Sequence, residues 1–281
     1  MTQALACFER DARVVNGSVA SLKSLAEGRE AEIFDWEPGV ILKLYRRDGG
    51  MRSRTEWLAM TAVANSGGPA RAAIGLVEIE GRVGLLMERI DGADLLTELG
   101  RAPWKVRTAG ALTGTAQALV NKTPAPPQLE RLKNRLHRQI ESSPLVPDEY
   151  RMVAARALAE LPDGDRLCHG DLHPGNVMRT ARGTAVIDWS NAASGDPAAD
   201  VARTLNLLTL GEPPPGTSQM TLRLHSLGRR ILRSQYIDAY QNAHPIDTAR
   251  VARWRLPIVV ARLSDGIEAE RARLLTAIEQ T

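Results

Sequence analysis

The feature that most limits the fold is a short segment, residues 166–189, in which apolar strand patterns alternate with turns and polar side chains. A strand at its start leads into a loop that contains Asp171. From Asn176 the chain follows a second strand, turns at residues 181–183 and returns along a third strand to Asp188. A hairpin of this length places Asn176 opposite Asp188. Oxygen atoms from three separated side chains are therefore predicted to converge.

These three side chains suit phosphoryl transfer. The amide of Asn176 and the carboxylate of Asp188 provide oxygen ligands that magnesium accepts beside water and substrate phosphates. The carboxylate of Asp171 can accept a proton from an attacking hydroxyl group. The spacing D-x-x-x-x-N, followed by a later Asp, matches the phosphoryl-transfer template. The alternative, three ordinary structural residues, would require matched spacings to coincide by accident.

Strand patterns precede Asp91-Gly92 and helix patterns follow it. We expect a strand at 18–25, hairpins at 32–45 and 75–90, and helices at 51–65, 104–120, 128–141, 148–161 and from Pro197 onward, with a break at 211–216. The predicted fold is α+β, with a small β-rich lobe at 1–89 and a large, mainly helical lobe at 90–281. A cleft between two such lobes is a natural ligand site.

Lys43 interrupts the apolar strand VILKLY, so its side chain lies on the same face as Ile41 and Tyr45. A cation in such a position needs an anion, and nucleotide phosphates or a carboxylate would serve. The alternative is an edge strand from which Lys43 extends into solvent.

The motifs HGDLHPGN, VIDW and GDPAAD together resemble the aminoglycoside phosphotransferase and choline kinase group, which is distantly related to protein kinases. The resemblance follows nearly the whole chain and is sharp across residues 166–201. It implies a two-lobed protein-kinase-like fold, ATP as co-substrate with GTP left open, and Mg²⁺. Matched by position, Asp171 corresponds to the catalytic base, and Asn176 and Asp188 correspond to the magnesium ligands.

The resemblance also implies a nucleotide site on the N-terminal lobe. Lys43 would hold the phosphates while paired with Glu56 on the following helix, although a solvent-facing Glu56 is the simpler alternative. Gly28 is the one glycine of the loop AEGREAEIF, where backbone amides would contact phosphate oxygens. In the joint LLMERIDG, adenine would bond to the backbone at Glu88 and Ile90.

Several neighbouring polar residues are predicted to have structural roles. Asp196 precedes Pro197 and is expected to cap a helix. By resemblance, Asp200 would support the catalytic loop from the interior. His169 would position that loop, and His173 would form a hydrogen bond within it.

The acceptor of the phosphate is left open among an antibiotic such as an aminoglycoside, an amino alcohol and a sugar. Seven residues separate Asp188 from Asp196, too few for the activation segment of a protein kinase, which favours a small hydroxyl substrate. Asp265, Glu268 and Glu270 would form an acidic patch for a polycation, but a solvated helix surface is the favoured interpretation. The helix that ends in AQALVNKTP lacks the Leu-His pair common in relatives.

Composition excludes other classes of protein. The net charge of +3 is spread along the chain, so nucleic acid is a poor candidate partner. Two cysteines are too few for a disulfide framework, and no apolar run approaches a membrane span, so we expect a cytoplasmic protein. A non-catalytic pseudokinase is the alternative from another functional class. It is disfavoured because Lys43 and the three motif residues are present. Oligomeric state is not readable from the sequence.

Overall fold

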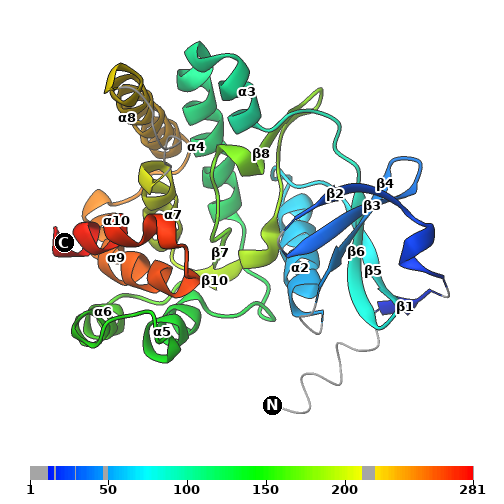
Figure 1. The fold of residues 1–281 in the computed structure, drawn as a ribbon, viewed down its shortest axis with the longest axis horizontal. Helices are drawn as coiled ribbons and strands as arrows, with labels where there is room; N and C mark the ends of the chain where they lie inside the picture. The colour runs from blue at the N-terminus through cyan, green and yellow to red at the C-terminus, as the bar shows by residue number, and fades with distance from the viewer. Residues whose placement is uncertain (1–11, 16, 29, 47–49, 211–218, 281) are drawn as a thin grey trace.

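The computed structural model describes residues 12–15, 17–28, 30–46, 50–210 and 219–280. Within these ranges, a sheet accompanied by a helix forms the N-terminal part, and a mainly helical part follows it (Figure 1). The structure confirms the predicted two-lobed, α+β fold of the protein-kinase type.

The N-terminal sheet has the strand order β1-β5-β6-β4-β3-β2. Its strands are β1 (Ala12–Val14), β2 (Lys23–Glu27), β3 (Ala31–Glu37), β4 (Val40–Tyr45), β5 (Ala73–Ile79) and β6 (Arg82–Glu88). Neighbouring strands are antiparallel except β1 and β5, which are parallel. Both expected hairpins are present, because β3 pairs with β4 and β5 pairs with β6.

Two short elements differ from the prediction. The strand expected at 18–25 was wrong in its first half, because a 3-10 turn, η1 (Val19–Ser21), precedes β2. The side-chain oxygen of Ser18 accepts a hydrogen bond from the Ala20 amide, so this capping residue favours the turn over a strand. The edge strand β1 was not expected.

Alternation along β4 decides where Lys43 points. Leu42 and Leu44 are fully buried in a cluster on the outer face of the sheet. Ile41, Lys43 and Tyr45 occupy the opposite face and line a cavity between the two parts of the molecule. The sequence prediction for this strand is therefore confirmed, and the edge-strand alternative is wrong because β4 lies between β3 and β6.

Helix α2 (Met51–Asn65) has the predicted bounds and lies between the sheet and the helical part (Figure 1). It contacts the sheet on one side and a 3-10 turn, η4 (Trp189–Asn191), on the other. Glu56 is 1% exposed in this position, so the solvent-facing alternative for this residue is wrong.

The helical part contains α3 (Leu95–Arg101), α4 (Val106–Lys122), α5 (Leu132–Ser142), α6 (Asp148–Ala159), α7 (Pro197–Leu210), α8 (Gln219–Ala243), α9 (Thr248–Arg262) and α10 (Glu268–Glu279). Helix α3 was not expected, and its N-cap Asp94 accepts from the Thr97 amide at 2.8 Å. Helix α4 begins after the 3-10 turn η2 (Pro103–Lys105). Helix α5 begins late because Arg131 pairs with Ser194. The break expected at 211–216 lies outside the described residues.

Helix α4 packs on α8 with almost no space between their backbones. A Cβ atom at Gly114 would lie 2.2 Å from the carbonyl oxygen of Tyr236, so the crossing requires glycine. The Tyr240 hydroxyl donates to Asn121 at 2.9 Å, and the Asn121 amide donates to Asp200 at 2.9 Å. Hydrogen bonds thus connect α8 through α4 to α7.

The strand-rich segment predicted at 166–189 is present within the helical part. Strand β7 (Arg166–Cys168) pairs with β10 (Ala193–Gly195), and β8 (Val177–Thr180) pairs with β9 (Gly183–Val186). Within the described ranges, no helix combines the length and the apolar character needed to cross a membrane.

Candidate active site

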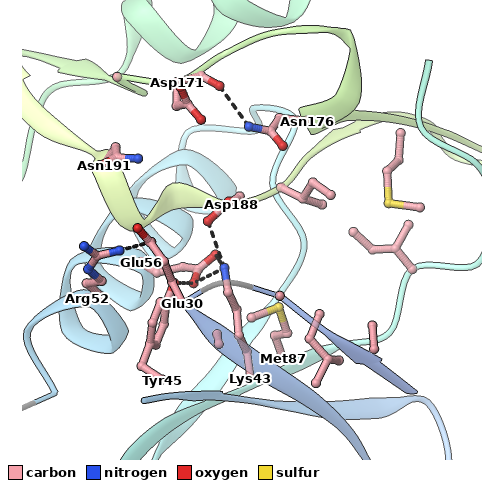
Figure 2. A pocket seen from close by; sticks show the side chains of 18 of the residues that line it. Glu30, Lys43, Tyr45, Arg52, Glu56, Met87, Asp171, Asn176, Asp188 and Asn191 are labelled. Carbon is pink, nitrogen blue, oxygen red and sulfur yellow. Dashed lines mark hydrogen bonds and ion pairs between the residues drawn. The ribbon is translucent and has the colours of Figure 1, made fainter. Parts of the chain in front are cut away.

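A cavity of about 970 Å³ lies between the sheet and the helical part. Its sheet end is lined by residues of β2, β3, β4, α2 and the joint at 87–92. Its helical end is lined by residues of α5, α7, α9 and the 3-10 turn η5 (Leu263–Asp265). In Figure 2, Asp171 and Asn176 lie across from the strand that carries Lys43, with Asp188 between them.

Lys43 binds two carboxylates at the sheet end. Its Nζ atom lies 2.9 Å from Glu56 Oε2 and 2.9 Å from Asp188 Oδ1 (Figure 2). Burial would lower the pKa of Lys43, but the two carboxylates outweigh it and raise the pKa above its ordinary value. Burial would raise the pKa of Asp188, but Lys43 holds it below its ordinary value. Both groups are therefore charged at neutral pH.

Glu56 joins three elements. The Tyr45 hydroxyl of β4 donates to Glu56 Oε2 at 2.6 Å, and the Trp189 amide of η4 donates to Oε1 at 3.0 Å. Neither contact was expected from the sequence. The Tyr45 contact could have been predicted, because Tyr45 follows Lys43 by two residues and lies on the same face of β4. The Trp189 contact depends on where α2 packs, which no local pattern reports.

The donor set around Asp188 fits a hard cation. Lys43 and the Ser190 hydroxyl both donate to Asp188 Oδ1, which leaves Oδ2 for a cation. Asn176 Nδ2 donates to the backbone carbonyl of Asp171 at 2.8 Å, which leaves Asn176 Oδ1 as its other polar atom. One carboxylate and one amide oxygen are ligands of the type that Mg²⁺ takes. The backbone of Asp188 is left-handed, at φ 61° and ψ 68°, a conformation that aspartate tolerates better than most residues.

His169 and Gly170 fix the loop that carries Asp171. His169 Nδ1 accepts from the Asp171 amide at 3.3 Å, and the Nε2 atom lies 3.0 Å from the carbonyl of Ile187. The tautomer protonated at Nε2 satisfies both contacts. A Cβ atom at Gly170 would lie 2.3 Å from the carbonyl oxygen of Asn191, and φ is +79° there, so the position requires glycine.

Asp200 supports this loop from the interior, as the resemblance implied. Its carboxylate accepts the amides of Gly170 at 2.8 Å and His169 at 3.0 Å. Within the loop, His173 Nδ1 accepts from the Gly175 amide at 3.0 Å, as predicted. The geometry gives Asp200 a positioning role.

Asp196 caps helix α7 as predicted, because its Oδ1 atom accepts from the Ala198 amide at 3.0 Å. Its second oxygen accepts from Arg250 and from the Trp254 indole, both at 2.7 Å. The residue therefore also connects α7 to α9, a contact that was not expected from the sequence.

The loop between β2 and β3 contributes Gly28 and Glu30 to the sheet end. The Gly28 amide donates to the Ala31 carbonyl at 2.9 Å, which closes a tight turn. Glu30 forms an ion pair with Arg52 of α2 (Figure 2). The loop is thus tied to the helix that carries Glu56.

Glu88 and Ile90 of the joint also line the sheet end. The Glu88 amide donates to the Ala72 carbonyl at 3.0 Å, so this amide is already engaged within the sheet region. The Glu88 side chain forms an ion pair with Arg182, at the turn between β8 and β9. The joint is therefore connected directly to the hairpin that positions Asn176 and Asp188.

Helix α5 supplies one wall of the helical end. Leu132, Arg135, Leu136 and Gln139 line the cavity and follow the spacing of one helix face. Arg135 is held by Glu130 and by the carbonyls of residues 191 and 192. From sequence alone, the leucines of this face resemble ordinary core residues.

The other wall of the helical end contains Arg203, Ile258, Arg262 and Asp265. Asp265 Oδ2 lies 2.8 Å from Arg262 and 3.4 Å from Arg203. Arg203 also donates to the Gly170 carbonyl at 3.2 Å and lies 3.8 Å from Asp171 Oδ1. Arg203 follows Asp200 by three residues on α7, a spacing that could have indicated a shared face.

The three acidic residues considered as a patch at 265–270 have different surroundings. Glu268 is exposed, whereas Glu270 accepts two hydrogen bonds from Arg262, at 2.7 and 2.9 Å. Asp265 alone of these three residues lines the cavity. The solvated-surface interpretation therefore holds for Glu268 and is wrong for the two arginine-bound carboxylates.

Comparison with solved structures gives the same fold. APH(2")-IIia in complex with GDP and kanamycin has a TM-score of 0.57 at 17% identity, over 94% of this chain and 91% of the other. APH(2")-IIa in a ternary complex with streptomycin and ATP has a TM-score of 0.57 at 16% identity, over 100% and 96%. Macrolide 2'-phosphotransferase MphH from Brachybacterium faecium has a TM-score of 0.55 at 16% identity, over 99% and 97%.

Sequence comparison identifies the family. No curated protein matches the chain. The model of the phosphotransferase enzyme family matches residues 21–256, which include strands β2 to β6 of the sheet, the strand-rich segment and most of the helical part. This match spans far more than half of the sequence, so the chain belongs to the phosphotransferase enzyme family.

Proposed function

We propose that this phosphotransferase is a small-molecule kinase that transfers the terminal phosphate of ATP, or of GTP, to a hydroxyl group of a small acceptor. The observation that carries the proposal is the arrangement around one cavity of Lys43 with its two carboxylates, of Asp171, and of Asn176. Solved structures of the same fold contain GDP, ADP or ATP, which supports a purine nucleotide as the co-substrate.

Each residue would have one role. Lys43, held by Glu56, would bind nucleotide phosphates at the sheet end, with backbone amides near Gly28 beside them. The Glu88 carbonyl and the Ile90 amide would bond the base. Residues 1–89 would thus bind the nucleotide, and residues 90–281 would carry the catalytic and acceptor-binding groups.

Asp171 would orient the acceptor hydroxyl and take its proton as the oxygen attacks the terminal phosphorus. Asn176 and Asp188 would hold Mg²⁺, which when bound supplies positive charge that stabilises the phosphate oxygens. Most of the acceleration would come from positioning and from electrostatics arranged in advance. The pseudokinase alternative has no support in this site, where Lys43 and the three motif residues are all in place.

Two measurements test the proposal. Calorimetry should detect ATP or GTP binding that depends on Mg²⁺. Release of ADP or GDP should rise with one class of compound in a panel of aminoglycosides, macrolides, amino alcohols, nucleosides and sugars. Asp188→Asn should abolish turnover and the magnesium dependence of nucleotide binding. The matched control is Asp165→Asn, since the Asp165 side chain is 90% exposed. Full activity in Asp188→Asn would refute the metal assignment.

A further inference from the structure

The helical end holds two of its three carboxylates, those of Asp265 and Asp200, with hydrogen-bond donors from the protein itself. Asp265 is bound by Arg262 at 2.8 Å and by Arg203 at 3.4 Å. Asp200 accepts the backbone amides of His169 and Gly170. Asp171, in the catalytic loop at the boundary with the sheet end, lies 3.8 Å from Arg203. Among the described residues that line this end, no other acid occurs.

A polycationic acceptor would meet the wrong charges here. Its ammonium groups need carboxylates that are free to pair with them, because moving a cation out of water without a counter-charge is costly. At this end they would instead compete with Arg203 and Arg262 for Asp265. They would also lie near Arg135, a third guanidinium on the opposite wall. Like charges brought together in one cavity lower affinity.

The rest of the surface suits an apolar ligand face. Leu132 and Leu136 of α5 lie on one wall and Ile258 of α9 on another. These side chains are 6%, 5% and 3% exposed, so core packing holds them rigidly and each presents a small apolar edge to the cavity. Gln139, on the same face of α5, offers a neutral polar group beside them. Apolar walls with a few placed polar groups are usual for small-molecule sites.

We propose that the acceptor is a hydroxyl compound with an apolar face that carries no charge or at most one positive charge, and that the helical end excludes polycations. This inference rests on the proposed kinase function and names the substrate class of the same site. Arg203 and Arg262 act as specificity residues because they occupy the carboxylates that a polycation would require.

The test compares two probes in the presence of Mg²⁺ and a non-hydrolysable ATP analogue. A macrolide with one amine, such as erythromycin, represents the first class, and kanamycin represents the polycations. Calorimetry should give a dissociation constant for the macrolide at least tenfold lower than that for kanamycin.

A charge substitution sharpens the test. Gln139→Glu adds an isosteric carboxylate to the helical end, and Arg135 cannot readily neutralise it because Glu130 and two carbonyls already hold that guanidinium. The affinity for kanamycin should rise at least fivefold, and the gain should shrink at high salt. Gln128→Glu, an exposed site outside the cavity lining, should leave the affinity for both probes unchanged.

The failures of the two proposals are distinguishable. Absence of Mg²⁺-dependent nucleotide binding would refute the kinase function, whatever the acceptor results. With nucleotide bound, kanamycin binding as tight as macrolide binding would overturn the acceptor class, as would absence of macrolide binding. An unchanged kanamycin affinity in Gln139→Glu would show that charge at this end does not select the ligand, which also overturns it.

Discussion

The two ends of the cavity differ in how their charged side chains are paired. At the sheet end one ammonium, that of Lys43, contacts two carboxylates, so the cluster keeps an excess of negative charge that a divalent cation would complement. At the helical end Asp265 lies between two guanidinium groups, and apolar side chains are among the residues that line the walls. The first arrangement is suited to gather a metal and phosphates. The second is suited to a ligand that brings little charge of its own.

This difference indicates that different chemical requirements determine the residues at the two ends. Transfer of a phosphoryl group requires positive charge at defined points whatever the acceptor, so the residues of the sheet end and the catalytic loop follow from the reaction. The residues of the helical end follow from the acceptor alone. Substitutions at the two ends should therefore affect different kinetic constants.

The largest expected effect separates Asp171 from Asp265. Asp171→Asn removes the proposed base and should lower kcat by about 10²–10⁴-fold, with nucleotide binding retained. Asp265→Asn should act mainly on KM for the acceptor, because this residue shapes the wall on which the acceptor binds. Steady-state kinetics with the best acceptor measures both constants.

Asp148→Asn is the control for that comparison, since the Asp148 side chain is 99% exposed, and its constants should equal those of the wild type. A kcat for Asp171→Asn within threefold of the wild type would contradict the assignment of the base. A larger loss of kcat in Asp265→Asn than in Asp171→Asn would reverse the comparison between the two ends.

The sheet end was largely readable from the sequence, and the reason is local geometry. Alternation in β4 predicted that Lys43 lies on an inward face, and the structure confirms it. The β8–β9 hairpin brings Asn176 and Asp188 to the same end, but the prediction that they lie opposite each other was wrong by one residue, because Asn176 lies opposite Ile187. The fold class followed from the change of pattern near residue 91. These inferences use strand periodicity and turn residues, which act over a few positions.

The helical end was not readable, because its residues come from helices far apart in sequence. Arg203, Arg262 and Asp265 lie in or beside helices whose patterns indicate only a buried and an exposed face. The pairing of these arginines with carboxylates depends on how α7 packs on α9. No local sequence pattern predicts that packing. The favoured interpretation of residues 265–270 as a solvated surface was wrong for Asp265 and Glu270 for this reason.

The next effect concerns stability and compares two isosteric substitutions. Glu56→Gln removes a fully buried charge that Lys43, Tyr45 and Trp189 all contact, and should lower the free energy of unfolding by about 3–5 kcal/mol. Glu270→Gln removes one of two carboxylates from Arg262 at a site that is 18% exposed, and should cost about 1 kcal/mol. Urea unfolding without ligands measures both values, and equal losses would contradict the contrast between the ends.

The smallest expected effect concerns pH and the loop that joins the two ends. Of the described residues that line the cavity, none is a histidine. A change between pH 7.5 and 5 should therefore alter mainly the charges of residues outside the cavity lining. Burial lowers the pKa of His173 from its ordinary 6.5 and outweighs the opposing effect of Asp171. Below about pH 6.5, His173 binds a proton more readily in the unfolded chain than in the folded loop. Stability should therefore be greatest above about pH 6.5 and fall as pH decreases toward the folded pKa.

His173→Asn isolates this contribution. The asparagine carbonyl can still accept the hydrogen bond from the Gly175 amide, but it does not titrate. The melting temperature of this variant should fall less steeply than that of the wild type between pH 7.5 and 5. The pKa of His244 is also lowered by burial, so the variant should keep part of the slope. His137→Asn, at an exposed site, should follow the wild-type curve. If the melting temperature of His173→Asn has the same pH dependence as that of the wild type, His173 does not contribute to that dependence. The proposed contrast, in which the two ends of the cavity keep their charge while the loop between them titrates, would then be wrong.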